Sequence, residues 1–273
     1  MIDQVSQICY MFLAPVSVIS ELLLIFAFWK LRYFKKHPEI MIFWQSVSQI
    51  ILDLHWVTGL KTIKSYITDD KCLLIGAFSV YFYYLSWDYI LFLSIEILLK
   101  ILKPHKTEYK KRRIWYHSLA HLSSLSVFIV LATSNTNGTS YIKTCFIQKR
   151  TIYELIIIIP AFFHFPLSIG IILYTLIITH NTYVLPYLKY HMLVVVTFSL
   201  TWVPIAIVHS FIYFGLTEDI QEDFLYVNFK QVSILLGASS GFFVFLSRIQ
   251  QKGVLKKIFA AIFKKNPLKV TNK

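Results

Sequence analysis

Four acidic residues lie inside long apolar runs of the sequence: Glu21, Asp53, Asp88 and Glu96. A charge inside a bilayer is costly, so each acid is a candidate functional residue. We expect Asp53 to face the interior of a helix bundle, and Glu96 to pair with Lys100 one helical turn later. A single acid of this kind is more often a structural anchor between helices. For Asp53 and Asp88 together, a role in switching or ion transfer is an equal alternative.

Catalytic signatures are missing from the sequence. It contains no HExxH, no glycine-rich phosphate loop, no CxxC and no GxSxG. His117 and His121 are four residues apart, on one face of a helix, but no carboxylate or cysteine lies near them in the sequence. We interpret them as helix-packing residues. The sequence therefore predicts neither an enzyme nor a metal site built on histidines.

The composition is that of a membrane protein. Of 273 residues, 56% are hydrophobic and 15% are charged, whereas soluble domains carry about a quarter charged residues. The formal net charge of +13 would favour a nucleic-acid partner in a soluble protein. Here most basic residues fall in short gaps between apolar runs, so we exclude nucleic acid and expect contacts with anionic lipids of the inner leaflet.

Seven apolar runs are long enough to cross a bilayer as helices, which needs about 20 residues each. The fourth run is rich in serine and histidine and is the weakest of the seven. No internal repeat or second domain is visible, so we expect an all-α seven-transmembrane helix bundle over residues 1–253. The runs cover residues 8–29, 39–61, 72–101, 114–133, 151–179, 187–214 and 230–248.

The basic residues fall on one side of this arrangement. Twenty lie in alternate gaps and the tail, and seven lie in the opposite set. Because positive loops stay in the cytoplasm, the N-terminus is predicted outside, in a multi-pass protein of the plasma membrane. Asn137, in an Asn-Gly-Thr glycosylation acceptor, falls on the predicted outer side. Cys72 and Cys145 fall there too, where disulfides persist.

A short amphipathic segment follows the seventh run, after Gly253. Between Val254 and Phe263, apolar residues repeat at helical spacing and lysines flank them. We expect residues 254–273 to form a basic cytoplasmic tail whose first part is a helix in the inner headgroup plane. The alternative is a disordered basic tail.

Proline residues interrupt two of the predicted spans. Pro160 and Pro166 lie in the fifth, and Pro204 follows Trp202 in the sixth. Proline removes a backbone hydrogen bond, so these positions are potential hinges.

Aromatic and basic residues in the outer halves predict a ligand cavity that suits a small anionic or aromatic molecule; an ordinary aromatic belt is the alternative. The predicted cavity residues are His55, Tyr83, Tyr84, His164, His209 and Tyr213.

Several motifs together resemble a G-protein-coupled receptor, in particular the cyclic-AMP-receptor-like group of protists and its secretin-like relatives. A short basic gap runs into KKHPEIMIFWQSVSQIILD, which looks like the second helix of that group. Cys72 opens a segment of the form CxxIGAFxxYFYYLSWDY, and Cys145 lies in TCFI. GASSGFFVFLSR is similar to the seventh-helix motif. The likeness extends over nearly the whole chain.

The resemblance has implications for individual residues. Cys72 and Cys145 would form the disulfide between the third helix and the second outer loop. Phe198, Trp202 and Pro204 match an FxxxWxP spacing of the rhodopsin-like class, in which the tryptophan acts as a toggle. Asp53 resembles the second-helix aspartate that holds a sodium ion in that class, so a sodium ion near Asp53 is the only cofactor implied.

The sequence also departs from these receptors. The third run ends without an Asp-Arg-Tyr triplet, Val244 replaces an expected asparagine, and no NPxxY follows. No lysine occupies the middle of the seventh run, which argues against a retinal-binding protein. Only about seven residues precede the first span, so no large outer domain is expected.

The expected function is a cell-surface receptor that senses a small-molecule ligand and signals to a heterotrimeric G protein. Movement of the fifth and sixth helices would carry the signal. One alternative is a seven-helix transporter or channel that uses Asp53 and Asp88; another is a structural subunit of a membrane complex. The residues expected to face the G protein, or anionic lipid instead, are Lys106, Lys110, Lys111, Arg112 and Arg113.

Overall fold

The computed structural model is an all-α bundle with one small hairpin. It describes residues 2–31, 38–62, 69–103, 109–134, 137–139, 145–147, 151–179, 185–216, 224–250 and 254–263. The helices are α1 (Ile2–Lys30), α2 (Glu39–Thr62), α3 (Asp69–Leu102), α4 (Tyr109–Thr133), α5 (Leu155–Thr179), α6 (Leu185–Tyr213), α7 (Phe224–Ala238), α8 (Ser240–Ile249) and α9 (Val254–Phe263). Strands β1 (Asn137–Thr139) and β2 (Cys145–Ile147) pair antiparallel, and a 3-10 turn, η2 (Ile152–Glu154), precedes α5.

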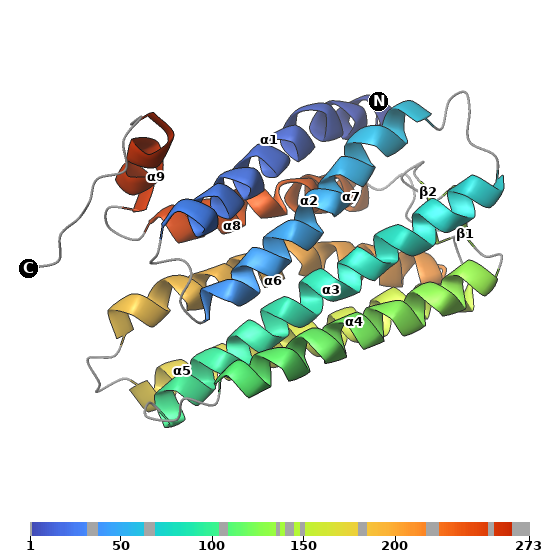
Figure 1. Cartoon of the computed structure of the whole chain (residues 1–273). Coiled ribbons are helices and arrows are strands. Elements are labelled where there is room, and N and C mark those ends of the chain that lie inside the picture. The colour runs from blue at the N-terminus through green and yellow to red at the C-terminus, as the bar shows by residue number, and fades with distance from the viewer. Residues whose placement is uncertain are drawn as a thin grey trace, which may run out of the picture.

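The long helices lie side by side along one direction (Figure 1). The hairpin lies at one end of the bundle and α9 at the other. We call the first the hairpin end and the second the basic end, because many described cations, among them Lys30, Lys100, Lys110 and Lys257, lie at helix termini there. Each of the seven predicted runs is helical, and α9 has the bounds expected for the amphipathic segment.

Helix α3 occupies the centre of the bundle. It contacts α2, α4, α5 and α6, and the hairpin packs against it as well. Its residues Ala77, Val80, Leu93 and Ile97 are fully buried. The remaining helices close around it, with α1 against α2, α7 and α8. Side chains of α3 therefore take part in the polar contacts with α4 and α5 described below.

The outer surface of the bundle is apolar. Large hydrophobic side chains of α4 and α5, such as Leu122, Ile129, Ile159 and Ile177, are more than half exposed. Such a surface matches lipid rather than water. Four helices are long and apolar enough to cross a membrane (Met11–Lys30, Tyr109–Thr133, Ile152–Thr179 and Leu188–Tyr213), and the bent pair Tyr226–Ala238 with Ser240–Ile249 makes a fifth if it is one span.

Helices α2 and α3 do not belong to this set of candidate spans. Both carry acidic residues that are buried inside the bundle, including Asp53 in α2 and Asp88 in α3. A polar helix is tolerated in a bilayer where its polar groups face other helices. The chain is thus a multi-pass helical membrane protein with four to five candidate spans, and the count of seven remains a prediction.

Helix α4, the weakest predicted span, is joined to α3 by polar contacts. The Tyr81 hydroxyl lies 2.6 Å from His121 Nδ1, and the Tyr89 hydroxyl lies 2.7 Å from His117 Nδ1. Both histidines of the i, i+4 pair therefore pack against tyrosines of α3, as the helix-packing interpretation expects. In an apolar environment such hydrogen bonds hold two helices together.

The seventh run is broken rather than continuous. Helices α7 and α8 meet at Ser239 with a bend of 57°. Glycine and serine surround the break, a composition typical of kinks. A Cβ atom on Gly241 would collide with Ser17 Oγ and lie 2.7 Å from Glu21 Cγ. Glycine at position 241 is therefore what lets the start of α8 touch α1.

Helix α9 packs on the bundle with one face. Val254 and Ile258 are buried, and α9 contacts α1 and α8. Leu255, Phe259 and Ile262 are exposed on the remaining surface. The segment is thus an ordered amphipathic helix, whereas its expected place among lipid headgroups stays a prediction.

Replacing Gly241 by alanine tests the close approach of α8 to α1. Because the new methyl group meets Ser17 and Glu21, we expect Gly241→Ala to lower the free energy of unfolding by roughly 1–3 kcal/mol. Gly170→Ala is the control, since nothing lies within 4 Å of its added Cβ atom, and we expect it to be neutral or stabilising by up to about 1 kcal/mol. Unfolding of both variants in mixed micelles measures the difference; equal stabilities would contradict the predicted contact.

Candidate functional site

The four intramembrane acids belong to three different groups of contacts. Glu21 and Asp53 lie together between α1 and α2, Asp88 lies between α3, α4 and α5, and Glu96 lies between α3 and α4. All four are buried. The structure therefore does not join Asp53 and Asp88 in one cluster, as a shared ion path would require.

Glu21 and Asp53 form what we call the carboxylate cluster, together with Ser17, Gln45, Ser46 and Gln49. The amide of Gln49 donates a 3.0 Å hydrogen bond to Asp53 Oδ1. Gln45 and Ser46 adjoin Glu21, and Ser17 adjoins Asp53. Every member is at most a few per cent exposed. Asp53 thus faces the bundle interior, as the sequence predicts.

The carboxylate cluster contains many buried oxygen atoms without a hydrogen bond. Within the described part of the chain, neither carboxylate oxygen of Glu21 makes a hydrogen bond of good geometry, and neither does Asp53 Oδ2, although Ser46 and Ser17 lie close to them. The amide groups of Gln45 are likewise unpaired. Unpaired buried polar groups are expensive, so this arrangement needs either a proton, a cation or water.

Asp88 is the centre of the second group. His164 Nε2 lies 2.9 Å from Asp88 Oδ1, and the Ser123 hydroxyl donates to Asp88 Oδ2. His164 Nδ1 lies 2.8 Å from the carbonyl oxygen of Pro160, which can only accept, so Nδ1 carries a proton. One further proton is then shared between His164 Nε2 and the Asp88 carboxyl group. This pair joins α3 to α5.

Tyr84 lies one turn from Asp88 and compensates a defect in α5. Pro160 has no N–H, so the carbonyl of Ile156 loses its usual helical partner. The Tyr84 hydroxyl donates to that carbonyl. The kink in α5 is therefore held by a side chain of α3.

Aromatic rings fill the space between α3, α5 and α6. Trp202 packs edge-on against Tyr83, with ring centroids 4.7 Å apart, and Trp87 contacts both Trp202 and Phe165. Phe198 lies behind Trp202, at 6.1 Å. All five rings are buried. We call them the aromatic cluster. It places the predicted toggle Trp202, two residues before Pro204, in contact with two rings of α3.

The predicted ligand-cavity residues lie in different surroundings. Tyr83, Tyr84 and His209 are buried, while His55, His164 and Tyr213 are half-buried. Tyr83 belongs to the aromatic cluster, and Tyr84 and His164 contact α5 and α3 as described. A ligand cavity formed by these residues remains a prediction.

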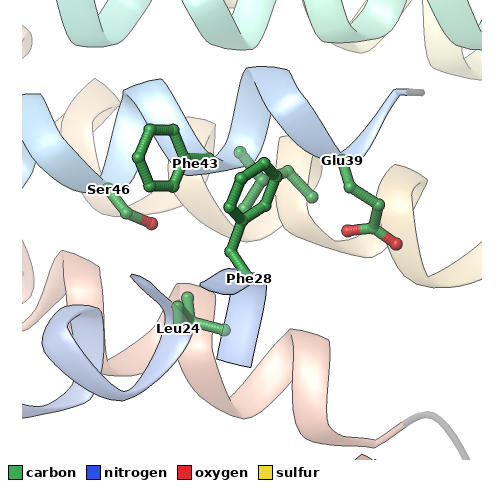
Figure 2. A pocket seen from close by; sticks show the side chains of 6 residues that line it. Leu24, Phe28, Glu39, Phe43 and Ser46 are labelled. Atoms are coloured by element: carbon green, nitrogen blue, oxygen red, sulfur yellow. The ribbon is translucent and has the colours of Figure 1, made fainter. Parts of the chain in front are cut away.

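A hollow lies between α1 and α2, toward the basic end (Figure 2). Its walls include the stacked rings of Phe28 and Phe43, 4.4 Å apart, with Glu39 and Ser46 on either side of them. Ser46 also belongs to the carboxylate cluster. The hollow, roughly large enough for one water molecule, therefore has Glu39 in one wall and a member of that cluster in another.

At the basic end, three buried charged or titratable side chains meet. Arg248 of α8 donates from Nε and Nη2 to the two carboxylate oxygens of Glu39, and the Nε contact is 3.1 Å. His191 Nε2 of α6 lies 3.1 Å from Glu39 Oε1. All three residues are at most 1% exposed. We call them the inner tie, since they join α2, α6 and α8.

Sequence reasoning missed the inner tie. None of its three residues is among the candidate residues that the sequence pattern predicts. The signal available was weak: an acid at the first residue of one apolar run, and a histidine and an arginine just inside the ends of two others. Nothing in the sequence shows that these three ends meet.

Glu96 pairs across helices. Arg112 Nε donates to Glu96 Oε1 at 2.6 Å, and the Tyr116 hydroxyl donates to the same oxygen at 2.8 Å. Arg112, predicted to face a G protein, is thus engaged with α3, although 28% of its side chain stays exposed. Lys110, Lys111 and Arg113 are exposed near the start of α4. Lys106 lies outside the described residues.

The hairpin brings the expected cysteine segments near each other. Cys145 lies in β2, Asn137 lies in β1, and both strands contact α3, which contains Cys72. The cysteine side chains lie outside what the structure describes, so the disulfide stays a prediction, as does glycosylation of Asn137.

A double-mutant comparison tests the Asp88–His164 pair. Removing His164 alone leaves a buried carboxyl group with one partner fewer, so we expect His164→Ala to cost about 3 kcal/mol of unfolding free energy. Adding Asp88→Asn to that variant removes the uncompensated group and costs little more. Unfolding of the wild type, both single variants and the double variant gives the coupling, which we expect to exceed about 1 kcal/mol; strictly additive effects would contradict the pair.

No protein-family model matches the chain, and no curated protein matches it. The likeness to receptors therefore rests on the motifs of the sequence. What the helices establish is a multi-pass helical membrane protein with polar contacts concentrated around α3 and at the basic end.

Proposed function

We propose that this protein is a seven-span cell-surface receptor that binds a small extracellular ligand and activates a cytoplasmic heterotrimeric G protein. The N-terminus lies outside, the basic end lies in the cytoplasm, and anionic lipids of the inner leaflet contact the lysines of that end. The observation that carries the proposal is the inner tie, which fastens α6 to α2 and α8 at the basic end.

The inner tie supports two alternative states of the bundle. A buried ion pair resists separation, because each charge left alone in the interior costs several kcal/mol. Pro204 interrupts the backbone of α6 between the tie and the hairpin end. A closed state with the tie formed, and an open state with the basic end of α6 moved outward, is the kind of change that signalling bundles use.

The aromatic cluster supports a route from ligand to tie. Trp202 and Trp87 each have a buried indole N–H without an acceptor among the described residues. A ligand with an acidic or carbonyl oxygen could satisfy them, in agreement with the small anionic or aromatic ligand expected from the sequence. Because Trp202 and Pro204 lie on the same helix as His191, a displacement of Trp202 would reach the inner tie through α6.

The transporter alternative gains less support. It needs Asp53 and Asp88 on one path, but their partners lie on different helices, α1 and α2 for Asp53 and α4 and α5 for Asp88. No contact surface described above supports the alternative of a structural subunit in a membrane complex. The receptor is the function that the polar contacts support best.

The orientation can be tested without a ligand. We expect enzymatic deglycosylation to lower the apparent mass of the wild type expressed in eukaryotic cells, and Asn137→Gln to abolish this change. An impermeant lysine reagent should label Lys110 and Lys111 only after the cells are permeabilised, because the basic end faces the cytoplasm. Labelling of these lysines in intact cells would reverse the orientation.

Signalling is tested by opening the inner tie. We expect Glu39→Gln to raise ligand-independent nucleotide exchange on a co-expressed heterotrimeric G protein about fivefold or more, since a coupling of 1–3 kcal/mol shifts populations by that amount. Glu96→Gln is a matched control, because it removes a buried carboxylate near the same end that joins α3 to α4 instead of holding α6.

Three results decide this test. Exchange raised by Glu39→Gln but not by Glu96→Gln supports the receptor. Equal effects of both variants would show that the inner tie has no special role. If folded Glu39→Gln at the cell surface activates none of the G proteins of a complete panel, the receptor function is wrong.

A further inference from the structure

The carboxylate cluster carries an inference that is independent of signalling. Two carboxyl groups, Glu21 and Asp53, lie fully buried and near enough to act on each other electrostatically. Neither forms an ion pair with a lysine, arginine or histidine in the part of the chain that the structure describes. Two neighbouring negative charges cannot remain uncompensated in such an interior, so a positive charge from outside the chain must balance them.

The surrounding groups indicate what kind of charge this is. Seven oxygen atoms of the carboxylate cluster are buried without a hydrogen bond of good geometry among the described residues, although Ser46 and Gln45 lie close to Glu21 and Ser17 lies close to Asp53. They are both oxygens of Glu21, Oδ2 of Asp53, the amide oxygens of Gln45 and Gln49, and the hydroxyls of Ser17 and Ser46. Protons on the two acids would neutralise their charge, but most of these other acceptors would stay unpaired. A metal ion satisfies several oxygens at once.

We propose that the carboxylate cluster binds one calcium-type divalent cation between α1 and α2. The ligands are carboxylate, amide and hydroxyl oxygens, the set that calcium prefers, with six to eight positions in flexible geometry. A divalent ion balances two carboxylates completely, whereas a single sodium ion would leave one buried negative charge. Magnesium demands a stricter octahedron and retains its water, and zinc prefers nitrogen and sulfur ligands, which the cluster lacks.

The position of the site gives it a structural effect. Gly241, at the start of α8, lies directly against Ser17 and Glu21. An ion that draws Glu21 toward Asp53 therefore fixes the part of α1 against which the start of α8 packs. The hollow of Figure 2 adjoins the site through Ser46.

Direct binding to the purified full chain in nanodiscs tests the proposal. With radioactive calcium, we expect one ion per wild-type chain and a rise in melting temperature of roughly 5 °C at 100-fold excess over the dissociation constant. Glu21→Gln and Asp53→Asn should each weaken calcium binding about tenfold or more, since even indirect metal partners contribute 10–100-fold. Glu154→Gln, which removes a buried acid on η2, is the control and should bind as the wild type does.

Other outcomes overturn the proposal. If sodium stabilises the wild type and calcium does not, the site binds a monovalent cation, as the resemblance to rhodopsin-like receptors implies. If acid pH alone stabilises the protein and no ion binds, the two carboxyl groups hold protons. Should either acid variant fail to fold, Ser17→Ala and Gln45→Leu take its place, and unchanged calcium affinity in both would refute the site. Loss of calcium binding leaves the nucleotide-exchange test of the receptor unaffected.

Discussion

Neutralising charge inside an apolar bundle is the constraint from which the rest of this structure follows. Three of the buried acids are met by groups from other helices: Glu39 by Arg248 and His191, Asp88 by His164 and Ser123, Glu96 by Arg112 and Tyr116. Hydrophobic burial cannot choose among helix arrangements in lipid, because lipid tails are as apolar as leucine. Paired charges do discriminate between helix arrangements, because a misplaced helix would leave a buried charge without its partner. The polar contacts therefore define which helices are neighbours.

The same constraint explains how α2 and α3 can carry acidic residues inside the bundle. They touch protein on most sides, so their polar groups meet partners, whereas α4 and α5 present leucine, isoleucine and phenylalanine outward. Helix α4 combines both features. Its tyrosine and arginine face α3 through Glu96, and its histidines bond to Tyr81 and Tyr89, while the opposite face is exposed.

Much of the fold was predictable from the sequence, and the sites only in part. Hydrophobic runs and charge gaps located every long helix and the amphipathic α9, because these depend on local composition. The inward position of Asp53 followed from its depth. Other partners of the acids did not follow: Glu96 also accepts hydrogen bonds from Arg112 and Tyr116 of α4, and the inner tie joins residues 209 positions apart. Which side chains pair across two helices depends on how each helix is rotated about its own axis, and this rotation cannot be read from a single sequence.

The bond from Tyr84 to the carbonyl of Ile156 has a consequence for how α5 can move. It fastens the turn around Pro160 to α3, and the His164–Asp88 contact fastens the next turn. Of the two prolines in α5, only Pro166 then lies beyond these anchors, on the side of the basic end. The fulcrum of the helix is therefore Pro166. The segment from there to Thr179 forms a lever arm, while the half above it stays part of the fixed frame.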